Sequence, residues 1–225
     1  MLILVTDTSG KNGSVALSRA DHGSDDVRVI EAVPLAGGTF SAQLVPQIAG
    51  LLEKHGFSKS EIDAFVVVSG PGSFTGLRVG LAAVKGLAEI LNKPIVPISL
   101  LEWVARSGGL QGKVLAALDA GRGEVYTGKY EVTGNTAKVI EEKVLSQDEF
   151  LSVGREWMPV TPVEGLATLA RNSGLTVVQV GAMKLEEIAR LGWQKLRAGE
   201  TVSPDQLEAN YVRRSDAEIL AKVNS

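Results

Sequence analysis

Apolar and polar residues follow each other along the first hundred positions in a way that predicts an α/β domain. Continuous apolar runs are typical of strands buried on both faces, whereas strict alternation indicates a strand with one exposed face. By these patterns, the expected strands are 2–5, 14–18, 27–33, 65–68 and 95–98. Asn12-Gly13, which precedes the second strand, is a strong hairpin signal. Helical spacing covers 41–55 and 74–91, and Ser73 is the expected N-cap of the second helix.

The second half of the chain repeats this order. The same order of features occurs twice: an apolar strand, an aspartate, two small residues and a turn. It is found in Leu2–Ser9, with Asp7, and in Val114–Gly121, with Asp119. Further strands are expected over 124–131, 137–144 and 176–180, and a helix over 184–197. Thr161-Pro162-Val163-Glu164 predicts another helix start, with proline at the first helical position and glutamate closing a capping box.

Two similar halves predict duplicated α/β domains of the actin/hexokinase/Hsp70-like superfold (ASKHA, ribonuclease H-like), in a compact version. The expected N-terminal domain is 1–105, a strand meander with two helices. A smaller C-terminal domain follows over 106–204, and the segment from about 205 to 225 is expected to return to the first domain.

Composition and charge narrow the function classes. A formal net charge of -3 argues against a protein that grips nucleic acid unaided, because such proteins usually carry a basic face. The absence of cysteine excludes disulfides, thiolate catalysis and cysteine metal sites. Charges interrupt the longer apolar stretches, and the apolar run at the amino terminus is too short for a signal-peptide core. We therefore expect a cytoplasmic protein with no membrane association.

The segment from Ser69 to Gly80 carries the most information about chemistry. A glycine-containing loop that runs from a strand into a helix presents backbone N–H groups to an anion, although the spacing here is not that of a Walker loop. The alternative is a tight turn whose small residues serve packing. On the first interpretation, the residues that face a nucleotide or phosphate are Asp7, Thr8, Ser9, Gly70, Gly72, Ser73 and Thr75.

The run from Gly70 to Gly80 also resembles the signature of the TsaB (YeaZ) family. Its residues are Gly-Pro-Gly-Ser-Phe-Thr-Gly-Leu-Arg-Val-Gly. Asp119–Tyr126 resembles a second family block, and Asp7-Thr8-Ser9 and Tyr211-Val212-Arg213 fit as well, so the resemblance spans the chain from Leu2 to about Arg213. The sequence departs from the family at two places: Phe40 stands where members often have histidine, and Ala209 where proline is usual.

The resemblance implies a non-catalytic dimerisation subunit. The complex it would serve transfers a threonylcarbamoyl group to N6 of adenosine 37 in tRNAs that read codons beginning with A. The implied partners are a TsaD-like catalytic subunit and a TsaE-like ATPase, with a homodimer in isolation and tRNA reached only through the complex. This chain would require no cofactor of its own, and ATP or ADP would belong at the partner interface.

Neither histidine is expected to bind a metal. TsaD holds its metal with two histidines four apart on a helix, whereas His22 and His55 are 33 positions apart in this chain. No catalytic residue and no metal ligand is therefore assigned.

Two other enzyme classes are weighed against the subunit interpretation. An ATP-dependent small-molecule kinase of the same superfold needs two phosphate loops and a catalytic aspartate. Asp7 lies where actin-like folds coordinate the metal of a nucleotide, and its alternative role is to cap the turn after the first strand. A peptidase needs a nucleophile–base pair or a metal, for which two widely separated histidines are a poor basis.

The helix over 74–91 has an unusually wide apolar surface. Its charged residues Arg78, Lys85 and Glu89 cluster in one narrow sector, which leaves an apolar arc of roughly 220°, about twice what covering one side of a sheet requires. Either other parts of the chain cover both sides, or this helix and 41–55 form a dimerisation face. On the second interpretation, the interface candidates are Leu44, Ile48, Leu51, Gly76, Leu77, Gly80, Leu81 and Val84. Leu81→Glu or Val84→Arg would then give a folded monomer.

Overall fold

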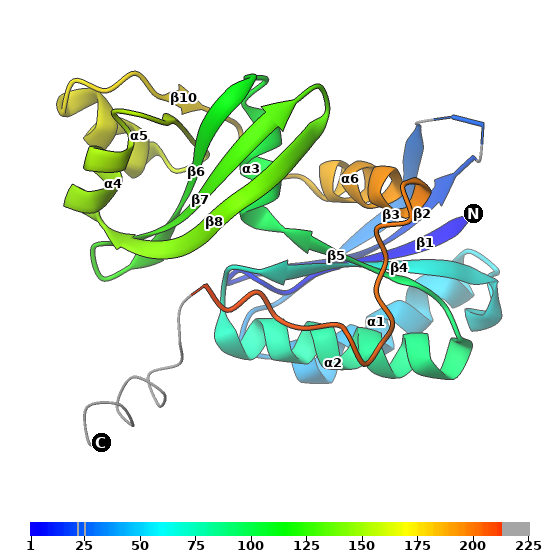
Figure 1. Ribbon diagram of the computed structural model, residues 1–225. Coiled ribbons are helices and arrows are strands. Elements are labelled where there is room, and N and C mark those ends of the chain that lie inside the picture. Colours follow the sequence, from blue (N-terminus) through cyan, green and yellow to red (C-terminus); the bar gives the residue numbers. More distant parts are fainter. Residues whose placement is uncertain (22, 25, 213–225) are drawn as a thin grey trace. The chain divides into compact units, whose positions relative to one another are not determined.

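The computed structural model describes residues 1–21, 23–24 and 26–212. The chain forms two compact units (Figure 1). Among the described residues, the first unit comprises Met1–Ser99 and Met183–Asn210, and the second comprises Leu100–Ala182 with Tyr211 and Val212. In the described residues, no helix is long and apolar enough to span a membrane.

The first unit is built on a mixed sheet, which has five strands within the described residues in the order β3-β2-β1-β4-β5. Its strands are β1 (Leu2–Asp7), β2 (Gly13–Ala20), β3 (Val27–Leu35), β4 (Ile62–Gly70) and β5 (Ile95–Ser99). β1, β2 and β3 form an antiparallel meander, and β4 and β5 continue the sheet in parallel with β1. The hairpin at Asn12-Gly13 and all five predicted strands are confirmed.

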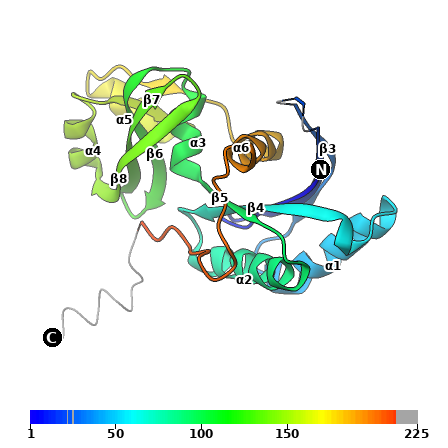
Figure 2. The same ribbon diagram turned by 45° about the vertical axis from the view of Figure 1, so that its right-hand side comes forward.

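Helices cover both faces of this sheet (Figures 1 and 2). On one face lie α1 (Phe40–Lys54) and α2 (Phe74–Leu91), and on the other lies α6 (Leu185–Arg197). A short 3-10 turn, η1 (Lys59–Glu61), precedes β4. The Oγ of Ser73 accepts a hydrogen bond from the Gly76 amide at 3.3 Å, which confirms the predicted N-cap of α2.

The second unit repeats the topology of the first. Its described part contains a sheet of five strands in the order β10-β9-β6-β7-β8. The elements are α3 (Leu100–Ser107), β6 (Gly112–Gly121), β7 (Glu124–Thr133), β8 (Thr136–Ser146), α4 (Gln147–Val153), β9 (Met158–Thr161), α5 (Glu164–Asn172) and β10 (Val178–Gln179). Read from β8, the sheet has the strand order and directions of the first, so the predicted duplication is confirmed.

The observed units differ from the predicted domains at residues 100–105, which lie in the second unit instead of the first, and at residues 183–204. Residues 183–204 were assigned to the second domain, but α6 packs on the sheet of the first unit. A Cβ at Gly192 would lie 2.5 Å from a methyl carbon of Val66, so the bare backbone of α6 sits directly against β4. Residues up to Asn210 also lie in the first unit, whereas 213–225 lie outside the described residues.

The predicted capping box at Thr161 is wrong. Thr161 is the last residue of β9 and is fully buried, and its Oγ1 accepts a hydrogen bond from the Val163 amide at 3.1 Å. Helix α5 begins only at Glu164, and its N-cap residue makes no side-chain hydrogen bond.

Candidate functional site

Asp7 closes the turn that follows β1. Its Oδ1 accepts two hydrogen bonds from Ser9, one from the amide at 2.8 Å and one from the hydroxyl at 2.6 Å. A carboxylate that binds the backbone two residues ahead forms an Asx turn. Asp7 therefore acts as the turn-capping residue that one of the two interpretations expected.

Gly72, just before α2, and Gly76 and Gly80 of α2 pack against this turn. A Cβ at Gly72 would lie 2.4 Å from the carbonyl oxygen of Ser9, and one at Gly76 would lie 2.1 Å from that of Thr8. A Cβ at Gly80 would lie 2.2 Å from the hydroxyl oxygen of Thr8. These distances are far below van der Waals contact, so the three glycines are required for the turn and the helix to meet.

Hydrogen bonds fix this contact. The Ser73 amide donates to the Ser9 carbonyl at 2.7 Å, and the buried Thr8 hydroxyl donates to the Gly76 carbonyl at 2.7 Å. The sequence-predicted nucleotide-facing residues are thus brought together, but Thr8 and Ser9 hydrogen-bond the loop backbone at Ser73 and Gly76. The geometry fits the packing interpretation of the loop, and Thr75 lies exposed on the first turn of α2.

The start of the glycine loop, at Ser69 and Gly70, is held by the segment that leads to Asn210. The Asn210 amide donates to the Ser69 carbonyl at 2.8 Å, and a Cβ at Gly70 would lie 2.9 Å from the Asn210 carbonyl oxygen. Gly70 also has φ of 129°, a conformation that favours glycine. Leu207 of this segment is buried in the core beneath, and Ala209 packs against the same core.

His55 belongs to a surface ion cluster. Its Nε2 lies 2.8 Å from Oε2 of Glu31, and the Lys54 Nζ donates to Oε1 of the same carboxylate at 2.7 Å. These bonds, from Lys54 first and then His55, lower the pKa of Glu31. His22 lies outside the described residues. Within the residues that the structure describes, no group of three or more His, Asp or Glu side chains is placed to hold a metal.

The turn after β6 in the second unit matches the Asp7 turn. The Asp119 Oδ1 accepts a hydrogen bond from the Gly121 amide at 2.7 Å, so the second family block also places its aspartate as a turn residue. Arg122 follows with φ of 56°, at an exposed hairpin tip.

The predicted interface residues of α1 and α2 face inward. Leu44, Ile48, Leu51, Leu77, Leu81 and Val84 are all buried in one core cluster, and Gly76 and Gly80 are buried against the Asp7 turn. The wide apolar arc of α2 is covered by the sheet, by α1, by that turn and by Val202, Leu207 and Ala209. The expectation that these side chains form a partner surface is therefore wrong in this structure, because the same unit already covers them.

The outward sides of α1 and α2 have a different composition. They expose Ala42, Val45 and Ala49 on α1, and Ala82, Gly86 and Ile90 on α2. We call these six residues the outer helix face. Ile90 is 77% exposed. Nearer the start of α2, the guanidinium of Arg78 stacks on the Phe74 ring at 3.6 Å from its centroid. None of these six residues was among the interface residues predicted from the sequence.

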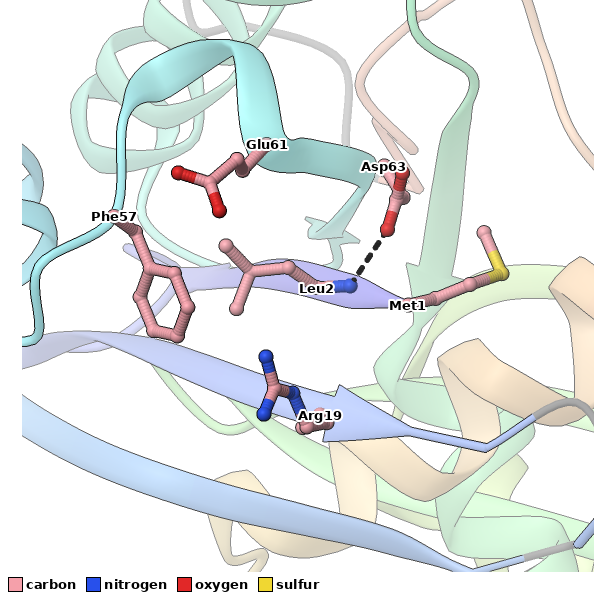
Figure 3. Close-up of a pocket in the computed structure, with 6 residues that line it drawn as sticks. All are labelled: Met1, Leu2, Arg19, Phe57, Glu61 and Asp63. Atoms are coloured by element: carbon pink, nitrogen blue, oxygen red, sulfur yellow. Dashed lines mark hydrogen bonds between the residues drawn. The ribbon is translucent and has the colours of Figure 1, made fainter.

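A separate pocket of about 290 Å³ lies where β1 begins (Figure 3). Asp63 accepts a hydrogen bond from the Leu2 amide at 2.8 Å, and Glu61 accepts one from the Ser58 amide at 2.8 Å. Arg19 lies over the Phe57 ring. Both carboxylates are hydrogen-bonded within the protein.

Two α/β units with one topology, joined in one chain, define a protein of the ASKHA, ribonuclease H-like class. The solved structure of YeaZ from Pseudomonas aeruginosa is similar with a TM-score of 0.69 and 26% identity, covering 93% of this chain and 99% of that one. A second structure, described as similar to peptidase YeaZ from the same organism, aligns with a TM-score of 0.65 and 26% identity, covering 94% of this chain and 99% of that one.

Sequence comparison agrees. The sequence model of the family TsaD, tRNA N6-adenosine threonylcarbamoyltransferase, matches residues 34–181. The tRNA threonylcarbamoyladenosine biosynthesis protein TsaB of Escherichia coli K12 is 29% identical over 96% of both chains. TsaB of Bacillus subtilis 168 is 32% identical over 70% of this chain and 65% of that protein. The chain belongs to the TsaB (YeaZ) family of tRNA threonylcarbamoyladenosine biosynthesis proteins.

Proposed function

We propose that this protein is a non-catalytic subunit that binds and supports a TsaD-like catalytic protein during threonylcarbamoyl transfer to adenosine 37 of tRNA. The observation that carries the proposal is the packed glycine loop: Thr8 and Ser9 contact its glycines and hydrogen-bond its backbone. A TsaE-like ATPase is the further partner. ATP or ADP would then belong at a partner interface, and this chain needs no cofactor.

The outer helix face is the proposed docking surface for the TsaD-like subunit. Its alanines and glycine permit close approach of another backbone, and Val45 and Ile90 supply exposed apolar area. The TsaD family model matches 34–181, which includes α1 and α2. A TsaD-like partner therefore has a comparable helix pair to place against this one, and in its absence a second copy of this chain can use the same face.

Gly86→Arg is expected to abolish association with the purified TsaD-like protein, because the new charge would be buried at the interface without a partner. The fold should survive, since Gly86 is exposed and a Cβ there meets no atom within 4 Å. Gly165→Arg on α5 is the matched control, because that helical glycine is equally exposed and unobstructed. Size-exclusion chromatography of mixtures checks the result. Normal association of both variants would exclude the outer helix face.

Cells depleted of this protein are expected to lose threonylcarbamoyladenosine from position 37 of tRNAs that read codons beginning with A. Nucleoside mass spectrometry measures the modification directly. Re-expression of the unaltered chain or of Gly165→Arg should restore it, whereas Gly86→Arg should not. Normal levels of the modified nucleoside after depletion would contradict the proposed function.

A further inference from the structure

Lysine is distributed unevenly in the second unit. Residues 100–182 contain four lysines, and all of them lie on β6, β7 or β8: Lys113, Lys129, Lys138 and Lys143. Lys113 pairs with Glu131, which pairs with Lys138. Lys129 pairs with Glu141, and Lys143 pairs with Thr127, two positions from Lys129 on β7. Directly paired residues of antiparallel strands point to the same face, so the four lysines share one face of the sheet.

Helices cover only part of this face. Leu115, Ala117 and Val125 belong to it by register, and they are buried in the core with Phe150 of α4 and Leu166 of α5. Lys113, Glu131, Lys138 and Glu141 are exposed, and Lys129 and Lys143 are partly exposed. These exposed lysines and glutamates therefore form the part of the sheet face that α4 and α5 leave uncovered. They extend about 10 Å across three strands. We call the four lysines the lysine face.

Two of the ammonium groups lie near Trp157, which is half-buried after α4. The Nζ atoms of Lys113 and Lys129 lie 5.5 and 5.7 Å from the centroid of its ring, within cation–π range. Lys129 and Lys143 share one carboxylate, with their Nζ atoms 3.7 and 3.1 Å from Oε2 of Glu141. The hydrogen bond from Lys143 and the charge of both lysines lower the pKa of Glu141.

This cluster is a local excess of positive charge in an acidic unit. Residues 100–182 contain eight Lys and Arg and ten Asp and Glu, which gives 8 − 10 = −2. By register, the face carries four lysines and three carboxylates, Glu131, Glu141 and Asp119, which gives 4 − 3 = +1. If these lysines served only to keep this face of the sheet in contact with water, each lysine would be paired with its own carboxylate, as is common for cross-strand pairs. Here one carboxylate serves two lysines, and an indole ring holds a third.

We propose that the lysine face binds the phosphodiester backbone of RNA, with Trp157 holding the ammonium groups of Lys113 and Lys129 in place and a phosphate taking the position that Glu141 occupies now. The inference rests on the proposed function, since tRNA is the RNA on which the family works. It adds to that function a contact between this subunit and the RNA itself, where sequence analysis expected contact only through the complex. Such contacts carry affinity without base specificity.

The test is direct binding of an unmodified tRNA transcript to the full chain, followed by fluorescence anisotropy. The variant Lys113→Gln/Lys129→Gln/Lys143→Gln is expected to bind roughly tenfold more weakly at low salt, and the slope of log K against log salt should fall by about 1 per lysine removed. The control is Lys11→Gln/Lys54→Gln/Lys59→Gln, which removes three exposed lysines from the first unit. Equal weakening by both variants, or no binding of tRNA by the unaltered chain, would overturn the inference.

Tryptophan fluorescence gives an independent readout. Trp103 and Trp193 are buried at 6% and 1% exposure, so Trp157 is the tryptophan that senses changes at the lysine face. Adding tRNA should change the emission as the ammonium groups turn toward phosphate, and Trp157→Phe should remove that change. A heparin titration that produces the same change at the same affinity would indicate a general polyanion site and would contradict an RNA site.

Failure of this inference is distinguishable from failure of the proposed function. The lysine variant should still co-elute with the TsaD-like protein, because its substitutions lie away from α1 and α2 in the sequence and leave the outer helix face intact. Loss of RNA binding with retained association supports the lysine face. Retained RNA binding in both triple variants, together with normal association, removes the lysine face and leaves the proposed function standing.

Discussion

Val84→Arg is expected to abolish the cooperative folding of the first unit. Val84 lies on α2 with 0% of its surface exposed, inside the core formed by the sheet, α1 and the segment near Leu207. A guanidinium there would be buried without a partner, and such substitutions cost on the order of 4–5 kcal/mol or more. That is comparable with the whole stability of many domains. Urea unfolding followed by circular dichroism measures the loss.

Ala82→Arg provides the matched control on the same helix. Ala82 is exposed on the outer helix face, so arginine there can extend into water, and the free energy of unfolding should change by no more than about 0.5 kcal/mol. The two variants add the same charge two positions apart. A well-folded Val84→Arg monomer with an unchanged urea midpoint would contradict the assignment of Val84 to the core.

The elements with local signals were predictable from the sequence. Helix α2 begins and ends where its pattern predicts, because Ser73 provides an N-cap and Asn92 adopts the left-handed conformation that ends a helix. Helix α4 was missed, although Ser146 and Glu149 form a capping box that the sequence displays. Helix α3 was missed for a different reason: it follows β5 directly at Leu100, and no turn residue separates the two elements.

The candidate site depended on contacts that no local pattern contains. The spacing of Gly72, Gly76 and Gly80 predicts close approach of another backbone, but not which one. The neighbour is the turn at Thr8, 68 positions from Gly76. The burial of α2 on two sides was predictable from its apolar arc, whereas the choice between core and partner surface was not. That choice depends on α1 and on residues 202–209, which reach the same core from distant parts of the chain.

Packing of the glycines against the turn leads to the second large effect. Gly76→Ala and Gly86→Ala are the same substitution in the same helix, and helix propensity alone favours alanine at both by about 1 kcal/mol. Gly86→Ala should therefore stabilise the protein by roughly 0.5–1 kcal/mol, because its Cβ meets no atom within 4 Å. Gly76→Ala should destabilise it by about 3 kcal/mol, because its Cβ would lie 2.1 Å from the carbonyl oxygen of Thr8, a backbone atom that cannot rotate away.

Gly80→Ala tests the same contact through a side chain that can be removed. The obstructing atom is the hydroxyl oxygen of Thr8, 2.2 Å from the new Cβ, whereas the Cβ of Thr8 lies 3.4 Å away. Thr8→Ala alone should cost about 1 kcal/mol, because it loses the hydrogen bond to the Gly76 carbonyl. In that background Gly80→Ala should cost far less than in the unaltered chain, which gives a favourable coupling energy of about 1–2 kcal/mol in a double-mutant cycle. Additive effects of the two substitutions on the free energy of unfolding would show that Thr8 and Gly80 do not touch.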